Sequence, residues 1–355
     1  MKKILHIINA MTPGGAEVLL ANSLSSGGLS EHTENHLAFF MGPSYLLDRL
    51  DNKVTIHNLN YKGVTDVWQL LQRIKKIIVD YNIDIVHSHL NPAGLYAHLA
   101  MPKGVKHIHT LHTTYSMDKE TTKTRLWLEK HLFLLKKSTN VILLSDFIKA
   151  DFINAIPFKG KAFVLNNFVP DHFFELKTND YNYHKKELKL IALGTLKPLK
   201  NFEYLIQVFQ HLKAENISLD IYGAGNKAVY EQTIAKLGVK VNMMGHIKNT
   251  AAVICNYDLF IMPSKFEGFP LSVFEAMAAG LPAMLSDIKP LKSIVNEHAI
   301  YFSLNDEHQV AAILKDIYNG KININEQSRN AKKYALATVT RAQYIHNLLS
   351  IYESI

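Results

Sequence analysis

The sequence contains a single cysteine, Cys255, among 355 residues. One thiol allows neither an internal disulfide nor a cysteine-based zinc cluster, and it favours a reducing compartment. Long hydrophobic runs are also missing, since no window approaches the roughly 18 apolar residues that a membrane-spanning helix requires. The apolar run behind the first two lysines is too short for a signal peptide. We therefore expect a cytoplasmic protein.

The sequence has fewer acidic than basic residues. Lys and Arg number 39, Asp and Glu number 31, and the net charge is +8. Such a surplus suits nucleic acid, an anionic bilayer surface or a phosphorylated substrate, and the absence of a recognisable nucleic-acid-binding module argues against the first. An apolar content of 48% excludes wholesale disorder. The length is about twice that of a typical domain, so we expect two domains.

The first half of the chain alternates short apolar runs with amphipathic segments. Residues 3–9 predict a strand that ends before Gly14 and Gly15, after which 16–24 has helical spacing. This is the opening of a nucleotide-binding-like unit, but it lacks the three spaced glycines of the dinucleotide fingerprint, which argues against NAD. Further strands are expected at 35–40, 54–59, 83–88, 106–111 and 140–145, and further helices at 66–81, 91–101 and 119–137.

This alternation predicts a parallel sheet whose ligands lie at the carboxyl ends of the strands. Five histidines lie near that edge, namely His87, His89, His107, His109 and His112. His107 and His109 share one face of their strand, whereas His112 falls just past its end. For the first four, histidines satisfied by neighbouring groups are the simpler interpretation. A zinc site is disfavoured because carboxylate or cysteine partners at ligand spacing are missing, and we expect no metal.

A second domain of the same construction is expected after a polar segment. Residues 173–187 have no convincing period and are interpreted as a linker. Residues 189–194 then predict a strand that runs into GTLKPLKN and an amphipathic helix, and 219–222 predict another strand before a glycine-rich turn. VNMMGHI, YDLFIMPS and PAMLS supply further short strands.

The most informative stretch is PSKFEGFPLSVFEAMAAGLP, residues 263–282. Gly268 tolerates positive φ, Pro270 favours a first helical turn, and Gly280 followed by Pro282 is typical of a helix end. The pattern therefore predicts a helix over 271–279.

Two carboxylates flank the start of that helix, Glu267 in the loop and Glu275 one turn inside. Unpaired backbone N–H groups are expected between them at Gly268, Phe269, Leu271 and Ser272. Such a helix end binds phosphate through its free donors and its dipole. The two carboxylates would repel phosphate, so they suit the neutral hydroxyl groups attached to it. Phosphate with many hydroxyls describes a nucleotide sugar.

The stretch EGFPLSVFEAMAAGLP, in which seven residues separate Glu267 from Glu275, resembles the signature of the retaining GT-B glycosyltransferases of family 4, also called glycosyltransferase group 1. The resemblance implies an α/β protein of GT-B architecture, with two Rossmann-like parallel-sheet domains facing a central cleft. It implies an acceptor-side domain at 1–172 joined by a C-terminal helix at 338–355, a linker at 173–187, and a nucleotide-sugar-binding domain at 188–337.

The resemblance also implies roles for individual residues. Glu275 would hold the ribose hydroxyls, and Lys200 would bind the diphosphate with the N–H groups of the helix end. Glu267 would contact the donor sugar near its anomeric carbon, with His112 beside the same sugar. Gly14 and Gly15 would let backbone approach the donor phosphate or the acceptor.

GTLKPLKN departs from the family pattern at one position. Thr195 stands where the family commonly has an arginine that neutralises the diphosphate, whereas Lys200 occupies the usual lysine position. Charge that develops on the leaving group must be stabilised, which is usually the largest catalytic contribution. Our hypothesis is that Lys197 substitutes for the missing arginine and that Thr195 donates a hydrogen bond.

We therefore expect a retaining, metal-independent glycosyltransferase of the hexosyltransferase type. It would move a sugar from a nucleoside diphosphate sugar, with a UDP-sugar favoured, to a hydroxyl of a glycan or lipid-linked acceptor in cell-surface polysaccharide or glycolipid synthesis. No cofactor is expected, and no Asp-x-Asp string, the usual sign of a metal-dependent transferase, occurs. A front-face mechanism is favoured by the resemblance, and a covalent one stays open. The alternatives are a nucleotide-sugar epimerase of the same fold and a non-catalytic nucleotide-sugar-binding partner.

One helix segment raises the question of a membrane. Residues 72–81 carry Arg73, Lys75 and Lys76 beside apolar positions, a pattern that would suit an anionic membrane surface. A solvated helix face is the simpler interpretation, and peripheral contact with the inner membrane surface is the alternative.

Overall fold

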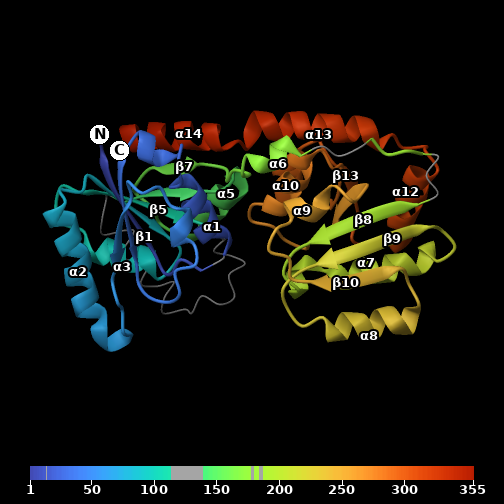
Figure 1. The fold of residues 1–355 in the computed structure, drawn as a ribbon, viewed down its shortest axis with the longest axis horizontal. Helices are drawn as coiled ribbons and strands as arrows, with labels where there is room; N and C mark the ends of the chain where they lie inside the picture. Colours follow the sequence, from blue (N-terminus) through green and yellow to red (C-terminus); the bar gives the residue numbers. More distant parts are fainter. Residues whose placement is uncertain (13, 113–138, 177–179, 184–186) are drawn as a thin grey trace. The chain divides into compact units, whose positions relative to one another are not determined.

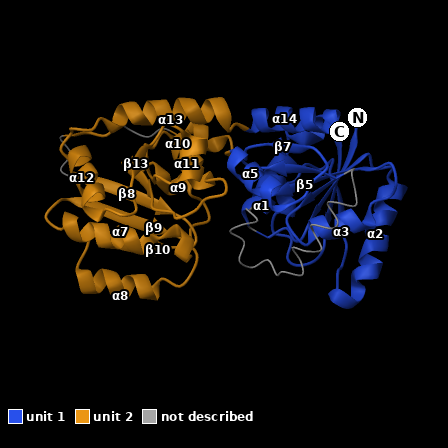
Figure 2. Cartoon of the chain, turned by 180° about the vertical axis from the view of Figure 1, so that it is seen from behind, with its two compact units in different colours: residues 1–168, 341–355 blue, residues 169–340 orange. Residues whose placement is uncertain are grey.

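The computed structural model describes residues 1–12, 14–112, 139–176, 180–183 and 187–355. By their internal contacts they form two compact units, which Figure 2 colours separately. Unit 1 comprises Met1–Phe168 with Arg341–Ile355, and unit 2 comprises Val169–Thr340. The segment 173–187, expected as a linker, falls within unit 2, where Phe173 and Tyr181 are buried. The helix expected over 119–137 lies outside the described residues.

Unit 1 is built on a parallel sheet of seven strands in the order β3-β2-β1-β4-β5-β6-β7. The strands are β1 (Lys3–Ile8), β2 (Glu34–Phe39), β3 (Thr55–Asn58), β4 (Ile85–His89), β5 (Lys106–Leu111), β6 (Thr139–Leu143) and β7 (Ala162–Val164). The six expected strands are confirmed within two residues at each end. β7 was missed because its three residues are too few to show a period.

Helices cover both faces of this sheet (Figure 1). They are α1 (Gly15–Ser23), α2 (Val67–Asp80), α3 (Ala93–Ala100), α5 (Asp146–Ala155) and α14 (Arg341–Ser354), with 3-10 turns η1 (Leu29–Glu31), η2 (Leu47–Arg49) and η3 (Val64–Asp66). Successive strand residues alternate between the faces. Ile4 and Ile8 pack in one cluster with α1 and α14, and Leu5 and Ile7 pack in another with α2 and α3.

Unit 2 repeats the design with six strands in the order β10-β9-β8-β11-β12-β13, all paired in parallel. They are β8 (Leu188–Leu193), β9 (Ile217–Tyr222), β10 (Val241–Gly245), β11 (Leu259–Met262), β12 (Ala283–Ser286) and β13 (Ile300–Phe302). The helices are α6 (His172–Glu175), α7 (Phe202–Val208), α8 (Ala228–Leu237), α9 (Ala251–Ile254), α10 (Leu271–Ala279), α11 (Lys289–Val295), α12 (Glu307–Tyr318) and α13 (Ile324–Thr338), with η4 (Pro198–Lys200) and η5 (Phe209–Leu212).

The strand order reverses once in each sheet. In unit 1 this occurs between β1 and β4, and in unit 2 between β8 and β11. Loops after such strands part to opposite faces and leave a crevice at the carboxyl ends, where open α/β sheets bind their ligands. The loops after these four strands are therefore the places to look for a site.

No helix in the described part of the chain is long and apolar enough to cross a membrane.

Candidate active site

Helix α10 begins and ends at the residues that the sequence pattern predicts, Leu271 and Ala279. Gly280 follows in the left-handed conformation with φ of 84°, and its N–H donates to Met277 O. This is a glycine-capped helix end, and the next N–H, of Leu281, donates to Ala276 O. Because Val273, Phe274 and Ala276 are buried, the helix is held firmly within unit 2.

The centre of the site is an ion pair at the switch point of unit 2. Lys200, in the loop after β8, places Nζ 2.7 Å from Oε1 of Glu267, in the loop after β11. The backbone also joins these two loops, because Lys265 N–H donates to Leu199 O at 2.8 Å. The structure therefore brings together two residues that the sequence assigned to the site.

Ser264 also holds Glu267 through a hydrogen bond, and it was not predicted from the sequence. Its hydroxyl donates to the same Oε1 at 2.5 Å, and its backbone oxygen accepts from the Ser286 hydroxyl at 2.6 Å. Ser264 and Ser286 are fully buried, and Glu267 is only 7% exposed. Two donors thus hold one carboxylate oxygen, whereas no hydrogen bond in the described part of the chain reaches Oε2.

Gly194 makes room for the Lys200 side chain. A Cβ atom at Gly194 would lie 3.1 Å from Cε and 3.2 Å from Cδ of Lys200. A Cβ atom at Gly223 would in turn collide with the Gly194 carbonyl oxygen. The two glycines therefore allow the loops after β8 and β9 to pack closely, which sets the path of Lys200 toward Glu267.

Thr195 and Lys197 lie in the same loop with exposed side chains. The Lys197 N–H donates to Thr195 O at 2.7 Å, and the Leu196 N–H donates to Ala224 O at 2.9 Å. Within the described residues the Lys197 ammonium has no carboxylate partner. The hypothesis that Lys197 replaces the family's arginine stays a prediction.

Glu275 lies on the second turn of α10 and is half-buried. Burial raises the pKa of its carboxyl group to about 7. None of the described residues donates a hydrogen bond to this carboxylate. A carboxylate in that setting gains by accepting hydrogen bonds from a ligand's hydroxyl groups.

The backbone donors at the α10 N-terminus differ in one respect from expectation. The Leu271 N–H donates to Phe269 O at 3.0 Å, so it is not free as the sequence pattern suggested. The tight turn at Pro270, with ψ of 74°, folds the chain back far enough for this contact. The N–H groups of Gly268 and Phe269 have no partner within the described ranges and remain available to an anion.

In unit 1, Gly14 and Gly15 lie at the start of α1, in the loop after β1. Gly14 is the N-cap, and its N–H donates to Thr12 O at 2.8 Å. The Glu17 carboxylate lies over Gly14, so that a Cβ atom there would collide with it. Burial raises the pKa of Glu17, whose own backbone hydrogen bond opposes the shift. At Gly15 a Cβ atom would have no described atom within 4 Å, which leaves backbone open to a ligand.

His112 follows β5 directly, as its place past the strand end predicts. Burial lowers the pKa of its imidazole to about 4, so the ring is neutral at pH 7. Its Nε2 is buried and has no hydrogen-bond partner among the described residues. The ring centroid lies 6.3 Å from that of His89.

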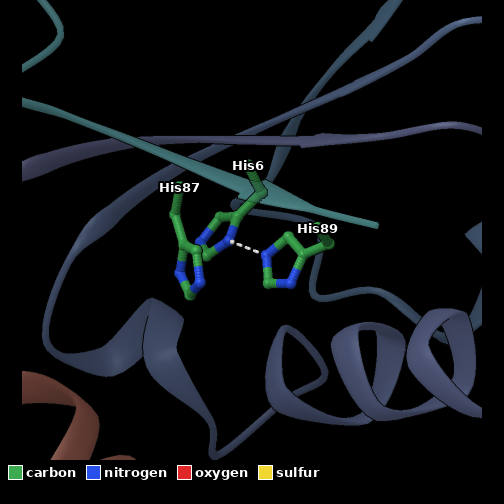
Figure 3. Close-up of side chains that lie close together, drawn as sticks. All are labelled: His6, His87 and His89. Carbon is green, nitrogen blue, oxygen red and sulfur yellow. Dashed lines mark hydrogen bonds between the residues drawn. The ribbon is translucent and has the colours of Figure 1, made fainter. Parts of the chain in front are cut away.

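Three buried histidines on the neighbouring strands β1 and β4 lie close together in unit 1 (Figure 3). His6 on β1 and His87 on β4 are paired residues of neighbouring strands, and His89 lies two residues further on. One ring nitrogen from each lies within 4.8 Å of the others. His6 Nδ1 is 3.3 Å from His89 Nε2, the contact that the dashed line marks. Sequence reasoning missed His6 because nothing local distinguishes it within an apolar strand.

These rings are satisfied by neighbouring groups. His87 has Tyr352 OH 2.6 Å from Nδ1 and Thr110 Oγ1 2.7 Å from Nε2. His6 Nε2 lies 3.3 Å from Asn35 Oδ1. A metal ion bound here would replace at least one of these contacts, and the group includes no carboxylate to balance its charge. Burial lowers the pKa of His6 to about 4 and holds those of His87 and His89 well below the usual value.

His107 and His109 are likewise buried within unit 1. Both rings contact the Ser88 hydroxyl, His107 through Nε2 at 2.8 Å and His109 through Nδ1 at 2.9 Å. They are packing histidines, as the sequence interpretation held.

Comparison with known proteins agrees with this construction. A model described as Glycosyltransferase Family 4 matches residues 4–173, and one described as Glycosyl transferases group 1 matches residues 174–336. Among curated relatives, the capsular polysaccharide biosynthesis glycosyltransferase CapH of Staphylococcus aureus is 28% identical over 312 residues, 84% of each chain. An Escherichia coli UDP-Gal:alpha-D-GlcNAc-diphosphoundecaprenol alpha-1,3-galactosyltransferase is 25% identical over 86% of this chain and 81% of its own.

Solved structures show the same fold. HepE of Anabaena, in complex with UDP and glucose, has a TM-score of 0.82 at 17% identity, with all of both chains covered. TarM has a TM-score of 0.80 at 12% identity, with 99% of each chain covered.

Two parallel sheets of Rossmann order, with an ion pair and a helix N-terminus at the switch point of the second, define a GT-B protein. The chain belongs to the glycosyltransferase group 1 family, family 4 of the glycosyltransferases. It is thus a nucleotide-sugar-dependent glycosyltransferase, and retention of anomeric configuration is typical of its family. The family and the GT-B fold inferred from the sequence are confirmed.

Proposed function

We propose that this chain is a retaining hexosyltransferase that moves a sugar from a UDP-sugar to a hydroxyl of a lipid-linked glycan in cell-surface polysaccharide synthesis. Three relatives support the proposal through what their names say of them. HepE binds UDP and glucose, the E. coli relative uses UDP-Gal and a diphosphoundecaprenol acceptor, and CapH acts in capsular polysaccharide biosynthesis.

The observation that carries the proposal is the Lys200–Glu267 ion pair in front of the α10 N-terminus. An ammonium group has three donors, so Lys200 can hold Glu267 with one and phosphate oxygens with the others. Positive charge fixed beside the leaving diphosphate stabilises the transition state more than the bound donor, because the negative charge grows as the bond breaks. The free N–H groups of Gly268 and Phe269 and the helix dipole add to this field.

Glu267 positions the sugar in this scheme. Its Oε1 is held by Lys200 and Ser264, so Oε2 is the atom left to accept a hydrogen bond from a sugar hydroxyl. Front-face attack is the mechanism that the family resemblance favours, and in it Glu267 needs only to hold the sugar. In front-face attack the departing phosphate oxygen takes the acceptor's proton as the new bond forms, and no side-chain base is needed.

Glu275 would bind the ribose. With a pKa near 7 the carboxyl group is only partly ionised before the donor arrives. Two hydroxyl donors would favour the charged form and lower its pKa, so binding and ionisation support one another. The roles that the family resemblance implies for His112, Gly14 and Gly15 stay predictions.

Donor turnover distinguishes this function from its alternatives. The purified protein is incubated with UDP-glucose, UDP-galactose and UDP-N-acetylglucosamine, with EDTA, with and without a lipid-linked oligosaccharide extract. Acceptor-dependent release of UDP supports a metal-independent transferase. Conversion of the sugar without acceptor would instead indicate an epimerase, and tight donor binding without turnover under any condition would indicate a binding partner.

A further inference from the structure

Three histidine side chains converge on one face of the sheet of unit 1. His6 and His87 are register partners on β1 and β4, and His89 lies two residues further along β4, on the same face. Although 83 positions separate His6 from His89, one ring nitrogen from each of the three lies within 4.8 Å of the others (Figure 3). All three side chains are buried. Convergent imidazole nitrogens shielded from water are a ligand set for a transition-metal ion.

The spacing of His6 and His89 is that of two ligands on one metal ion. His6 Nδ1 and His89 Nε2 are 3.3 Å apart. Two imidazole nitrogens that bind one tetrahedral zinc ion at about 2.0–2.1 Å lie about 3.3–3.4 Å from one another. The third nitrogen, from His87, is within 4.8 Å of both, so a shift of about 1.5 Å or less completes the set.

The contacts of Asn35 orient the lone pair of His6. Asn35 Nδ2 donates to Thr33 O at 3.0 Å, which fixes the orientation of the amide, and Asn35 Oδ1 lies 3.3 Å from His6 Nε2. Because an amide oxygen only accepts, His6 Nε2 carries the proton and Nδ1 presents its lone pair toward His89. Histidines that bind zinc commonly hold their other N–H on an oxygen in this way.

The other two rings can adopt the matching tautomers. No described residue forms a hydrogen bond to His89 Nδ1, so this atom can carry the proton and leave the Nε2 lone pair to a metal. His87 has Tyr352 OH 2.6 Å from Nδ1 and Thr110 Oγ1 2.7 Å from Nε2. A metal ion displaces one of these hydroxyls, and the other still holds the ring. The cost of forming the site is therefore one hydroxyl contact.

We propose that His6, His87 and His89 bind one zinc ion, with a water molecule in the fourth position. The set contains no carboxylate, but three imidazoles with a solvent ligand are a known zinc ligand set. Hard cations such as Mg²⁺ and Ca²⁺ prefer oxygen ligands and do not suit it. The sequence pattern disfavoured zinc because it showed no carboxylate or cysteine at ligand spacing. The register of β1 and β4 supplies His6 instead, which no local pattern contains.

A zinc ion at this place would join β1 and β4, the two strands between which the strand order reverses in unit 1. It should therefore stabilise unit 1. The chemistry proposed for Lys200 and Glu267 belongs to unit 2 and requires no metal. The inference is independent of the proposed function, and it is tested without donor or acceptor.

The test uses the full chain without a histidine tag, treated with chelator and dialysed against equimolar zinc. Elemental analysis gives the zinc content, and cobalt substitution gives the coordination number from visible absorption. The variants are His89→Gln, which removes a ligand, and Asn35→Ala, which removes the oxygen that orients His6. The matched control is His211→Gln with His308→Gln in unit 2, because these two rings also lie close together, with centroids 4.1 Å apart.

We expect the wild type and the control to retain about one zinc ion per chain, and cobalt to show the intense absorption of a four-coordinate ion. Asn35→Ala should weaken zinc binding about 10–100-fold, and His89→Gln at least about 100-fold. Zinc should raise the melting temperature of the wild type by at least about 3 °C and that of His89→Gln by much less.

Three results would overturn the inference. The wild type retains no zinc after dialysis, or its cobalt spectrum is that of a six-coordinate ion. Folded His89→Gln retains zinc as the wild type does. The control loses the zinc instead, which would place the ion at His211 and His308. Circular dichroism verifies the fold of each variant, and the cobalt spectrum of the wild type decides the matter if His89→Gln does not fold.

Discussion

Lys200 Nζ and Glu267 Oε1 lie 2.7 Å apart although 67 positions separate the two residues in the sequence. Both atoms are largely shielded from water, with the side chains 22% and 8% exposed. The pair exists because the loops after β8 and β11 leave neighbouring strands at the point where the strand order reverses. A diphosphate bound here, as we propose, would meet a cation already held in place.

Replacing Lys200 by Ala should lower donor turnover by about 10²–10³-fold, because it removes positive charge from the leaving diphosphate. Steady-state kinetics of UDP release measure this, with circular dichroism to verify folding. A folded Lys200→Ala variant that retains wild-type kcat would show that the pair serves structure alone.

Ser264→Ala should lower kcat about 10–100-fold while the fold is retained, because a hydrogen bond to a charged group is removed from Glu267. KM for the donor should change less, since Lys200 still holds the carboxylate. Ser286→Ala is the matched control, because among the described residues the Ser286 hydroxyl donates a hydrogen bond to the backbone oxygen of Ser264 and to no side chain. Equal losses in the two variants would count against a positioning role for Ser264.

Lys197→Ala tests whether this lysine compensates for Thr195. If Lys197 reaches the diphosphate, its loss should lower kcat/KM at least about tenfold, as for a charge-assisted hydrogen bond. Lys236→Ala, on the surface of α8, controls for net charge. An unchanged rate in Lys197→Ala would remove Lys197 from the site and leave Lys200 and the helix end to hold the leaving group.

The raised pKa of Glu275 has a consequence for stability. Because the folded state binds the proton more tightly than the unfolded state, the free energy of unfolding should fall as pH rises from about 4.5 to about 7. Glu275→Gln should remove this loss and stabilise the apoprotein at pH 8 by on the order of 1–3 kcal/mol. The same variant should bind UDP-sugars poorly. Urea unfolding at pH 5 and pH 8 checks the first effect, with Glu231→Gln as the surface control; equal stability of Glu275→Gln and wild type at pH 8 would contradict it.

The buried histidines predict the opposite pH dependence in acid. The folded-state pKa of His6 is about 4, below the usual 6.5, so unfolded chains bind more protons between these values. Between pH 6.5 and pH 5, stability should fall by about 1.6 kcal/mol for one such histidine. Chemical unfolding followed at both pH values measures the loss. An NMR titration in which the His6 ring becomes charged near pH 6.5 would disprove the assignment.

Local signals predicted most of the elements, and they singled out Lys200 and Glu267, which the structure brings together. Pro270 and Gly280 mark both ends of α10, and β-branched runs mark most strands, because these signals act within a few residues. Local signals could not identify the roles of Ser264 and His6. They also could not predict that the Leu271 N–H donates to Phe269 O. Ser264 acts through Glu267 and Ser286, and His6 contacts Asn35, His87 and His89 on the neighbouring strands. Such roles depend on strand order and register, which a local pattern does not contain.

Arg73 shows that a local sequence pattern also fails to assign the role of a surface residue. In the sequence it is one of three cations at helical spacing, whereas in the structure its partners are Asp66 and two backbone oxygens of the preceding loop.

The decisive measurement is the melting temperature of wild type and Lys200→Ala with UDP, GDP, ADP and their sugar conjugates, each with EDTA. A nucleotide at about 100 times its dissociation constant should stabilise the wild type by about 2.7 kcal/mol, a shift of a few degrees. We predict a shift that is selective for UDP compounds, survives EDTA and is largely lost in Lys200→Ala. No shift with any nucleotide, or an equal shift in the variant, would contradict a UDP-sugar site built on Lys200 and Glu267.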